Sequence, residues 1–266
     1  MPIHPTAVID RQAEIDPGAD IGPYVVVEGP VVVGLGTQVR AHAVLTGRTV
    51  IGRDNVIHYG AVIGDVPQDL GYRGEPTAVR IGDRNVIREH VEINRATKVD
   101  HPTELGDDNF LFGHAHVGHD SRVGNGVIIA NGAMLGGHVS VGDRVNISGN
   151  CVVHQFVRIG RLAMLRGGSR TSRDVPPFAM MDWTHTVRGI NRVGLRRAGF
   201  SAEAVRAVQR AFSSLFRTRR NLRAALADVE AEPMTPEVAE LVGFIRASTR
   251  GVCFGPRAGA GADDTD

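Results

Sequence analysis

The sequence predicts a parallel β-helix of about nine coils followed by a small all-α domain. Two observations predict the β-helix: an aliphatic residue recurs every six positions from residue 3 to residue 165, and a glycine often follows it. A third observation predicts the change of architecture. After the turn DVPPF at residues 174–178 the six-residue repeat is lost, and amphipathic helical patterns replace it.

The six-residue repeat is the strongest of these signals. Of the 28 positions that a step of six visits from Ile3 to Leu165, 26 are aliphatic, and the exceptions are Asp69 and Glu75. A period of six fits neither a helix of 3.6 residues per turn nor an alternating strand. It fits a short strand followed by a sharp turn, with three such units in each triangular coil. Residues three units apart should therefore stack on adjacent coils.

Two interruptions of the repeat predict loops that leave the β-helix. The first, at about residues 64–80, reads GDVPQDLGYRGEPTAVR and contains both non-aliphatic positions. The second runs from Ala96 to Glu104. Long loops on a rigid scaffold often carry function.

The domain organisation follows from where the repeat ends. We expect the β-helix to occupy residues 1–180 and the helical domain residues 181–250. Ser201 is a predicted N-cap, and the helix after it has an apolar stripe that consists of Val205, Val208, Phe212, Leu215 and Phe216. Shorter helical patterns follow around residues 222–230 and from Thr235 to about Ser248. Residues 251–266 are expected to form a disordered tail.

Composition excludes several classes of protein. The formal net charge is +1, which gives no reason to expect a nucleic-acid partner. No apolar run approaches the ~18 residues that span a bilayer, so we expect no transmembrane segment. The first residues, MPIHPTAVID, lack the basic region and apolar run of a signal peptide. These features predict a cytoplasmic protein.

A histidine-rich stretch, HAHVGHDSRVGN at residues 114–125, is the candidate functional site. Stacking places His119 below Gly137 and Gln155, and Asp120 below His138. The remaining histidines of the group, His116 and His154, should occupy nearby turns.

Three interpretations of this group are open. The first is a solvated polar turn, which is common at the corners of a β-helix. The second is a metal site like that of gamma-type carbonic anhydrases, but Ala78 and Asp83 occupy the places of a third ligand and His90 is not expected to stack with His114. We therefore expect neither a metal nor another cofactor. The third is general-base catalysis by a histidine whose tautomer is held by a carboxylate.

The sequence resembles the UDP-N-acetylglucosamine O-acyltransferases, which catalyse the first step of lipid A biosynthesis. The resemblance covers about residues 1–251 and is carried by IGDVPQDLGYRGEPT (63–77), IGDRNVIRE (81–89), HVGHD (116–120), GGHVSVGD (136–143), VVHQF (152–156), DVPPF (174–178), NRVGLRRAGF (191–200) and STRG (248–251). It implies a left-handed hexapeptide-repeat β-helix, a homotrimer with active sites between adjacent prisms, and transfer of a 3-hydroxyacyl group from acyl carrier protein to the 3-hydroxyl of UDP-N-acetylglucosamine.

The resemblance also assigns roles to residues of this chain. His119 matches the catalytic base, Asp120 its partner, and Gly137 a donor to the oxyanion. Gly167 matches the position that limits the length of the acyl channel. The positions that match substrate-binding residues are Gln68, Asp69, His116, His138, His154, Gln155, Asn191 and Arg197.

The chain departs from the family pattern at three places. Gly71 stands where a lysine is common, and Arg73 is a nearby candidate to replace its charge. Val193 and Ala198 stand where the family can carry a glutamate and an arginine. Some relatives acylate a 3-amino sugar, and a catalytically silent scaffold would share the fold, so both alternatives remain open at this point.

An arginine-rich segment suggests the protein partner. Residues 188–223 contain ten arginines and a single acidic residue, Glu203. Acyl carrier proteins are strongly acidic, so a basic helical face would attract them. Arg210 and Arg217 are the candidate docking residues, and the alternative is an ordinary basic helix surface.

Overall fold

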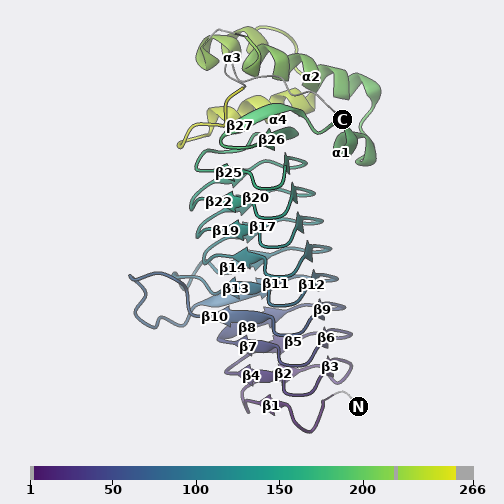
Figure 1. Cartoon of the computed structure of the whole chain (residues 1–266), viewed down its shortest axis with the longest axis vertical. Coiled ribbons are helices and arrows are strands. Elements are labelled where there is room, and N and C mark those ends of the chain that lie inside the picture. The colour runs from purple at the N-terminus through teal and green to yellow at the C-terminus, as the bar shows by residue number, and fades with distance from the viewer. Residues whose placement is uncertain (1–2, 219–220, 256–266) are drawn as a thin grey trace.

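The computed structural model describes residues 3–218 and 221–255. The chain climbs a three-sided prism, with one parallel sheet on each side and the helices gathered at the C-terminal end (Figure 1). We number the sheets 1 to 3 in the order in which the chain passes through them. The edges of the prism are named edge 1/2, edge 2/3 and edge 3/1 after the sheets they join.

The three sheets are built almost entirely from very short strands. Sheet 1 contains β1 (Val8–Ile9), β4 (Val26–Glu28), β7 (Val44–Thr46), β10 (Val62–Asp65), β13 (Glu92–Asn94), β16 (His116–Val117), β19 (Met134–Leu135), β22 (Val152–Val153) and β25 (Arg170–Thr171). Sheet 2 contains β2 (Glu14–Ile15), β5 (Val32–Val33), β8 (Arg48–Ile51), β11 (Ala78–Ile81), β14 (Thr103–Leu105), β17 (Arg122–Val123), β20 (Ser140–Val141) and β23 (Arg158–Ile159). Sheet 3 contains β3 (Asp20–Ile21), β6 (Gln38–Val39), β9 (Val56–Ile57), β12 (Val86–Ile87), β15 (Phe110–Leu111), β18 (Ile128–Ile129), β21 (Asn146–Ile147), β24 (Met164–Leu165), β26 (Ala179–Asp182) and β27 (Thr186–Ile190).

Aliphatic residues of the repeat fill the interior of the prism. Val117 pairs with Leu135 in sheet 1, and Leu135 with Val153, so each inner residue stacks on its equivalent in the next coil. All three are 1% exposed or less. The parallel pairing leaves each coil's backbone groups bonded to the coils above and below, which is why strands of only two residues suffice.

The two predicted excursions insert whole repeat units. Ile51 pairs with Ile81 and Ile81 with Leu105, so the first excursion adds two units and the second adds one. The sequence phase survives because both insertions are multiples of six. Val99 keeps the phase, yet it lies in the second excursion and is 51% exposed rather than internal.

The inserted units correct one prediction. His90 was not expected to stack with His114, because uninterrupted coils place these residues out of register. The structure stacks their rings at edge 3/1, with centroids 5.1 Å apart and planes 18° from parallel. The unit inserted by the second excursion brings the two histidines into line.

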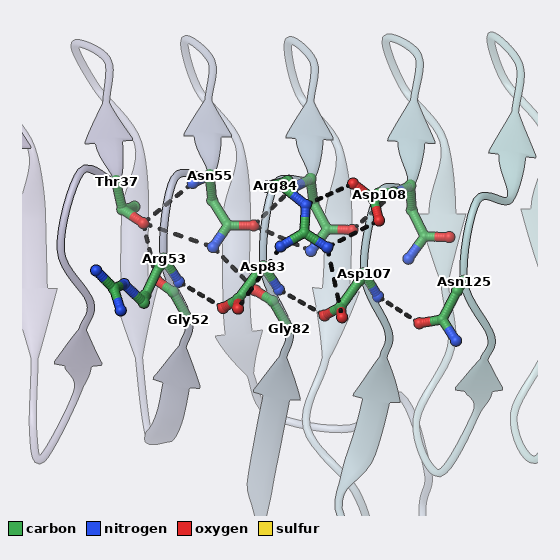
Figure 2. A network of polar contacts seen from close by, with 12 residues as sticks. Thr37, Gly52, Arg53, Asn55, Gly82, Asp83, Arg84, Asp107, Asp108 and Asn125 are labelled. Atoms are coloured by element: carbon green, nitrogen blue, oxygen red, sulfur yellow. Dashed lines mark hydrogen bonds and ion pairs between the residues drawn. The ribbon is translucent and has the colours of Figure 1, made fainter.

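A ladder of buried side-chain amides runs along edge 2/3 (Figure 2). The Nδ2 group of Asn85 donates to Oδ1 of Asn55, and the backbone N–H of Asn109 donates to Oδ1 of Asn85. The side chains of Asn55 and Asn85 are both fully buried. Outside the ladder, Asp107 and Asn125 accept backbone N–H groups from the coil below. These side chains satisfy turn amides that the short strands cannot reach.

The helical domain caps the last coil. Strands β26 and β27 form an antiparallel hairpin that extends sheet 3. Four helices follow: α1 (Arg192–Arg197), α2 (Ala202–Phe216), α3 (Leu222–Glu230) and α4 (Pro236–Arg246). Ser201 caps α2 as predicted and Thr235 caps α4, whereas the hairpin and α1 were not foreseen. The predicted stripe of α2 lies in the core, with Val205 only half-buried.

A buried carboxylate joins the helical domain to the prism. Asp174 is 1% exposed and accepts hydrogen bonds from the guanidinium of Arg158 and the hydroxyl of Ser248. Arg158 also donates to the carbonyl of Phe244 in α4. One anion therefore holds the last coil and the end of α4 together.

The disordered tail was predicted to begin at residue 251, but the first residues of that segment are packed against the rest of the structure. Val252 and Cys253 are buried, and Val252 and Phe254 form parallel bridges to Asp174 and Thr186. Residues 251–255 therefore pack on the end of the β-helix, and residues 256–266 lie outside the described part of the chain. Among the described residues, no helix has the length and apolar character needed to cross a membrane.

We predict that Asn85→Ala lowers the free energy of unfolding by about 2–4 kcal/mol, because it leaves a buried N–H of Asn109 unpaired and opens a small cavity. Chemical denaturation at a fixed protein concentration measures this. Asn125→Ala is the matched control at an exposed rung of the same edge, where water replaces the lost acceptor, and it should cost less than about 1 kcal/mol. Equal losses in the two variants would contradict a special role for the buried ladder.

Candidate active site

The centre of the candidate site is a buried histidine–carboxylate pair at edge 1/2. His119 and Asp120 lie in the turn after β16, and Asp120 adopts a left-handed conformation with φ of 59°. Nδ1 of His119 is 2.7 Å from Oδ2 of Asp120. The side chains are 9% and 5% exposed. The adjacent residues of one tight turn thus face each other with water largely excluded.

The second excursion holds the Asp120 carboxylate. The N–H and hydroxyl of Thr97 donate to its oxygens at 2.9–3.1 Å, and the backbone N–H of Asp120 donates to the hydroxyl of Thr103. Burial alone would raise the pKa of Asp120, but the hydrogen bonds from His119 and Thr97 outweigh it, so this pKa lies below its ordinary value. The ionised carboxylate accepts a hydrogen bond from Nδ1–H of His119, which leaves the lone pair on Nε2, where it can act as a base.

Gly137 lies against the imidazole of His119. A Cβ atom at this position would stand 2.5 Å from Cε1 of His119, so any side chain would displace the ring. Its N–H makes no hydrogen bond with the residues that the structure describes. A donor beside the base is therefore available to a developing oxyanion.

His138 lies one coil above the pair, as the stacking predicts. Its ring meets that of His119 edge-on, with centroids 5.3 Å apart, and stacks on Phe156 at 4.4 Å. Nε2 of His138 is 3.6 Å from Oδ2 of Asp120. Burial lowers the pKa of His138, which favours a neutral ring near pH 7.

The same three side chains could approach a metal ion. The ligand atoms of His119, Asp120 and His138 lie within 4.8 Å of one another. However, the Asp120 oxygens already accept hydrogen bonds from Thr97 and His119. A cation would have to replace the His119–Asp120 hydrogen bond, so the donor set fits an imidazole oriented by a carboxylate better than a metal centre.

Two predicted residues meet at a carboxylate that the sequence analysis missed. His116 in β16 has Nδ1 3.4 Å from Oε2 of Glu92, and Nε2 of Gln68 donates to Oε1 of Glu92 at 3.0 Å. Glu92 and His116 are paired in sheet 1. This pairing spans the inserted unit, so uninterrupted stacking could not reveal it.

The first excursion and the turn after β22 provide further predicted residues. Asp69 is exposed, accepts the N–H of Gly71, and its charge acts to raise the pKa of His138 against the larger effect of burial. His154 and Gln155 are exposed at edge 1/2. Nδ1 of His154 lies 3.4 Å from the guanidinium of Arg250, which follows α4.

Three other predicted residues do not join this cluster within one protomer. Asn191 caps α1 by accepting the N–H of Gly194, and it donates to the carbonyl of Leu162 at edge 2/3. Arg197 is exposed on α1. Gly167 lies at edge 3/1, in the turn after β24.

An open pocket of about 300 Å³ borders the pair on the sheet 2 side. Asp120 and His138 form part of it, and its other lining residues are Lys98, His101, Arg122, Val139 and Ser140. The wall contributed by the second excursion was not anticipated, because the sequence shows the excursion without showing where it folds.

The structure shows the surroundings of the three positions at which the chain departs from the family pattern. Arg73 donates to the carbonyls of Leu70 and Tyr72, so its guanidinium is used within the excursion and does not stand in freely for a lysine at Gly71. Val193 is 50% exposed on α1, and Ala198 is the C-cap of that helix.

The candidate docking arginines differ in their contacts. Arg210 is exposed on α2 beside an open groove formed with the α3–α4 segment. Arg217 caps α2 and donates to the carbonyl of Arg188 in β27. Two of the ten arginines in the basic segment, at positions 219 and 220, lie outside the described residues.

Comparisons with known proteins agree with this fold. A family model described as Udp N-acetylglucosamine O-acyltransferase, Domain 2, matches residues 174–253, and one for bacterial transferase hexapeptide repeats matches residues 102–137. An acyl-[acyl-carrier-protein]–UDP-N-acetylglucosamine O-acyltransferase of Anaeromyxobacter sp. is 46% identical over 95% of this chain and 99% of its own. The enzyme of the same name from Thermodesulfovibrio yellowstonii is 44% identical over 94% and 98%.

Solved structures give the same answer. A UDP-N-acetylglucosamine acyltransferase from Bacteroides fragilis matches with a TM-score of 0.89 and 39% identity, covering 94% of this chain and 99% of its own. The Francisella novicida enzyme matches with a TM-score of 0.91 and 33% identity, covering 96% and 95%. The predicted left-handed β-helix with a helical C-terminal domain is confirmed. The chain belongs to the UDP-N-acetylglucosamine O-acyltransferase family.

Proposed function

We propose that the protein transfers a 3-hydroxyacyl group from acyl carrier protein to the 3-hydroxyl of UDP-N-acetylglucosamine, the first step of lipid A biosynthesis. The names of the relatives include both acyl carrier protein and UDP-N-acetylglucosamine. The structural observation that supports it is the buried His119–Asp120 hydrogen bond of 2.7 Å, which leaves Nε2 of the imidazole as a base.

The chemistry follows from that arrangement. Nε2 of His119 takes the proton of the sugar hydroxyl as its oxygen attacks the thioester carbonyl carbon. Asp120 stabilises the imidazolium that forms, and the N–H of Gly137 donates to the oxyanion. When the C–S bond breaks, the imidazolium returns its proton to the departing thiolate, and the ester, the carrier thiol and the neutral base remain. The neutral ring of His138 adds no positive charge that would oppose protonation of His119.

The alternatives are less well supported. Transfer to a 3-amino sugar would use the same base, but the relatives' names specify O-acyltransferases. A silent scaffold gives no reason to bury an ionised carboxylate against a histidine, since an unused charge is costly to desolvate. The similarity to acyltransferases also gives no support to a metal-dependent anhydrase.

We also propose a homotrimer located in the cytoplasm. Gly167 lies at edge 3/1, Asn191 contacts edge 2/3 and Arg197 lies on α1, whereas His119 lies at edge 1/2. These family-matched positions therefore come together only if neighbouring prisms pack side by side. Three prisms around one axis would repeat that contact at every interface.

His119→Ala should lower kcat by on the order of 10²–10⁴, because it removes the general base. The measurement is transfer of a 3-hydroxyacyl group from acyl carrier protein to UDP-N-acetylglucosamine, with the product identified by mass spectrometry. His42→Ala, a histidine stacked on Tyr24 at edge 3/1, is the control and should retain activity. Full activity in His119→Ala would refute the mechanism, and a wild-type protein without transfer activity would refute the function.

Arg210→Glu should raise KM for acylated acyl carrier protein by about three- to tenfold, because it replaces an attractive charge by a repulsive one. KM for UDP-N-acetylglucosamine should not change. Arg11→Glu, at an exposed arginine of the first coils, controls for the overall change of charge. An unchanged KM for the carrier in Arg210→Glu would remove this residue from the docking surface.

Gly167 should allow a long acyl chain, because it has no side chain and even an added Cβ would meet no atom closer than 3.6 Å. We predict that Gly167→Met shifts the preference toward shorter 3-hydroxyacyl donors, as measured with a series of chain lengths. Gly243→Met in α4 also has open space around it and serves as the control. If both variants keep the wild-type profile, Gly167 does not limit the chain.

A further inference from the structure

We propose that Glu92 is a positioning residue, which fixes the tautomer of His116 and ties the first excursion to sheet 1. The inference rests on the proposed function, since it concerns how the acceptor sugar is held. It assigns a role to a residue that neither the family resemblance nor the sequence pattern singled out.

The contacts of Glu92 place it between two candidate substrate-binding residues. Its oxygen Oε1 accepts hydrogen bonds from Nε2 of Gln68 at 3.0 Å and from Nδ2 of Asn94 at 3.1 Å. The other oxygen, Oε2, lies 3.4 Å from Nδ1 of His116. The side chains of Glu92 and His116 are 38% and 21% exposed, so the group faces the outside of sheet 1 with solvent access.

These contacts assign the two carboxylate oxygens different tasks. Gln68 and Asn94 present N–H donors to Oε1, so this oxygen anchors the excursion. Asn94 strengthens the anchor, because the same Nδ2 group also donates to the carbonyl of Val66, in the first excursion. Arg95 adds a further contact by donating to the hydroxyl of Tyr72 and the carbonyl of Gly64.

The second oxygen sets the tautomer of His116, through its contact with Nδ1. An ionised carboxylate only accepts hydrogen bonds, so the imidazole nitrogen facing it carries the proton. Nδ1 of His116 is then the protonated nitrogen, and Nε2 keeps its lone pair. This nitrogen makes no hydrogen bond with the described residues. It is therefore an acceptor for a sugar hydroxyl or amide N–H.

The arrangement resembles that of the His119–Asp120 pair in the turn that follows the same strand, β16. His119 is oriented by a carboxylate beside it in sequence, and His116 by a carboxylate one coil below it. The two imidazoles flank Val117 and Gly118, so both lone pairs belong to one short segment. One histidine would activate the hydroxyl while the other holds the sugar.

Glu92→Gln tests the tautomer without cutting the anchor. Gln68 and Asn94 both require an acceptor, so the amide oxygen of the new side chain should occupy the place of Oε1. Its NH₂ group then faces Nδ1 of His116 and must donate to it. The proton of His116 is forced onto Nε2, and an acceptor for substrate becomes a donor.

The kinetic experiment uses the full-length protein with UDP-N-acetylglucosamine and acylated acyl carrier protein. Glu92→Gln should lower kcat/KM for the sugar nucleotide by about tenfold, the value of one hydrogen bond to substrate. The loss should appear mainly in KM, and KM for the carrier should stay unchanged. In a His116→Ala background the same substitution should cause little further loss, because the two residues act as a unit.

The matched control is Glu28→Gln, a glutamate at the end of β4 in the same sheet. It should leave both KM values and the thermal midpoint unchanged. The thermal midpoint of Glu92→Gln should also match that of the wild type, which separates positioning from loss of folding.

A spectroscopic measurement decides the tautomer directly. In ¹⁵N-histidine-labelled protein, with the His116 signals assigned from the His116→Ala variant, the wild type should carry the proton on Nδ1 and Glu92→Gln on Nε2. An unchanged tautomer, a wild-type kcat/KM in Glu92→Gln, or equal losses with and without His116 would each overturn the inference. Inactivity of the wild type itself would instead refute the proposed function.

Discussion

The structure depends on lateral hydrogen bonding between successive coils of the prism. Each strand is too short to be stable alone, so its backbone groups are satisfied only by the coils above and below. The chain can leave the prism, but it must return in register. Both excursions meet this condition by inserting whole six-residue units, as the pairing of Ile51 with Ile81 and of Ile81 with Leu105 shows. Loops of this kind add side chains to the surface without disturbing the core.

The same constraint positions the candidate site. Coils stack about 4.8 Å apart, so equivalent turn residues form columns in which neighbours must fit side by side. At edge 1/2 one column contains His119 and Gly137, and the next contains Asp120, His138 and Phe156. Glycine at position 137 is required because the His119 ring occupies the space of its side chain. The second excursion then returns beside this edge and supplies Thr97 to the carboxylate.

The parts of the structure that the sequence predicts are those that depend on the repeat. The period of six predicts the three-sided prism, and uninterrupted stacking above Leu105 predicts the neighbours of His119 and Asp120. Predictions fail where register depends on an insertion. His90 stacks on His114, and Glu92 faces His116, only because the second excursion adds one unit. The burial of Val252 and Cys253 was missed for another reason, since the isolated bridges of Val252 to Asp174 and of Phe254 to Thr186 leave no periodic pattern.

The two excursions have complementary effects on His119, at edge 1/2, and on His116, in sheet 1. The second excursion, through Thr97, holds Asp120 from the side of sheet 2, where the pocket with Lys98 and Arg122 lies. The first excursion, through Gln68, reaches Glu92 on the side of sheet 1. Each loop therefore hydrogen-bonds to a carboxylate that orients a histidine and does not orient the histidine itself. The rigid coils set the spacing of the imidazoles, and the loops set the hydrogen bonding of their carboxylates. Changes in loop sequence can thus alter the hydrogen bonding of these carboxylates while the structure of the prism stays the same.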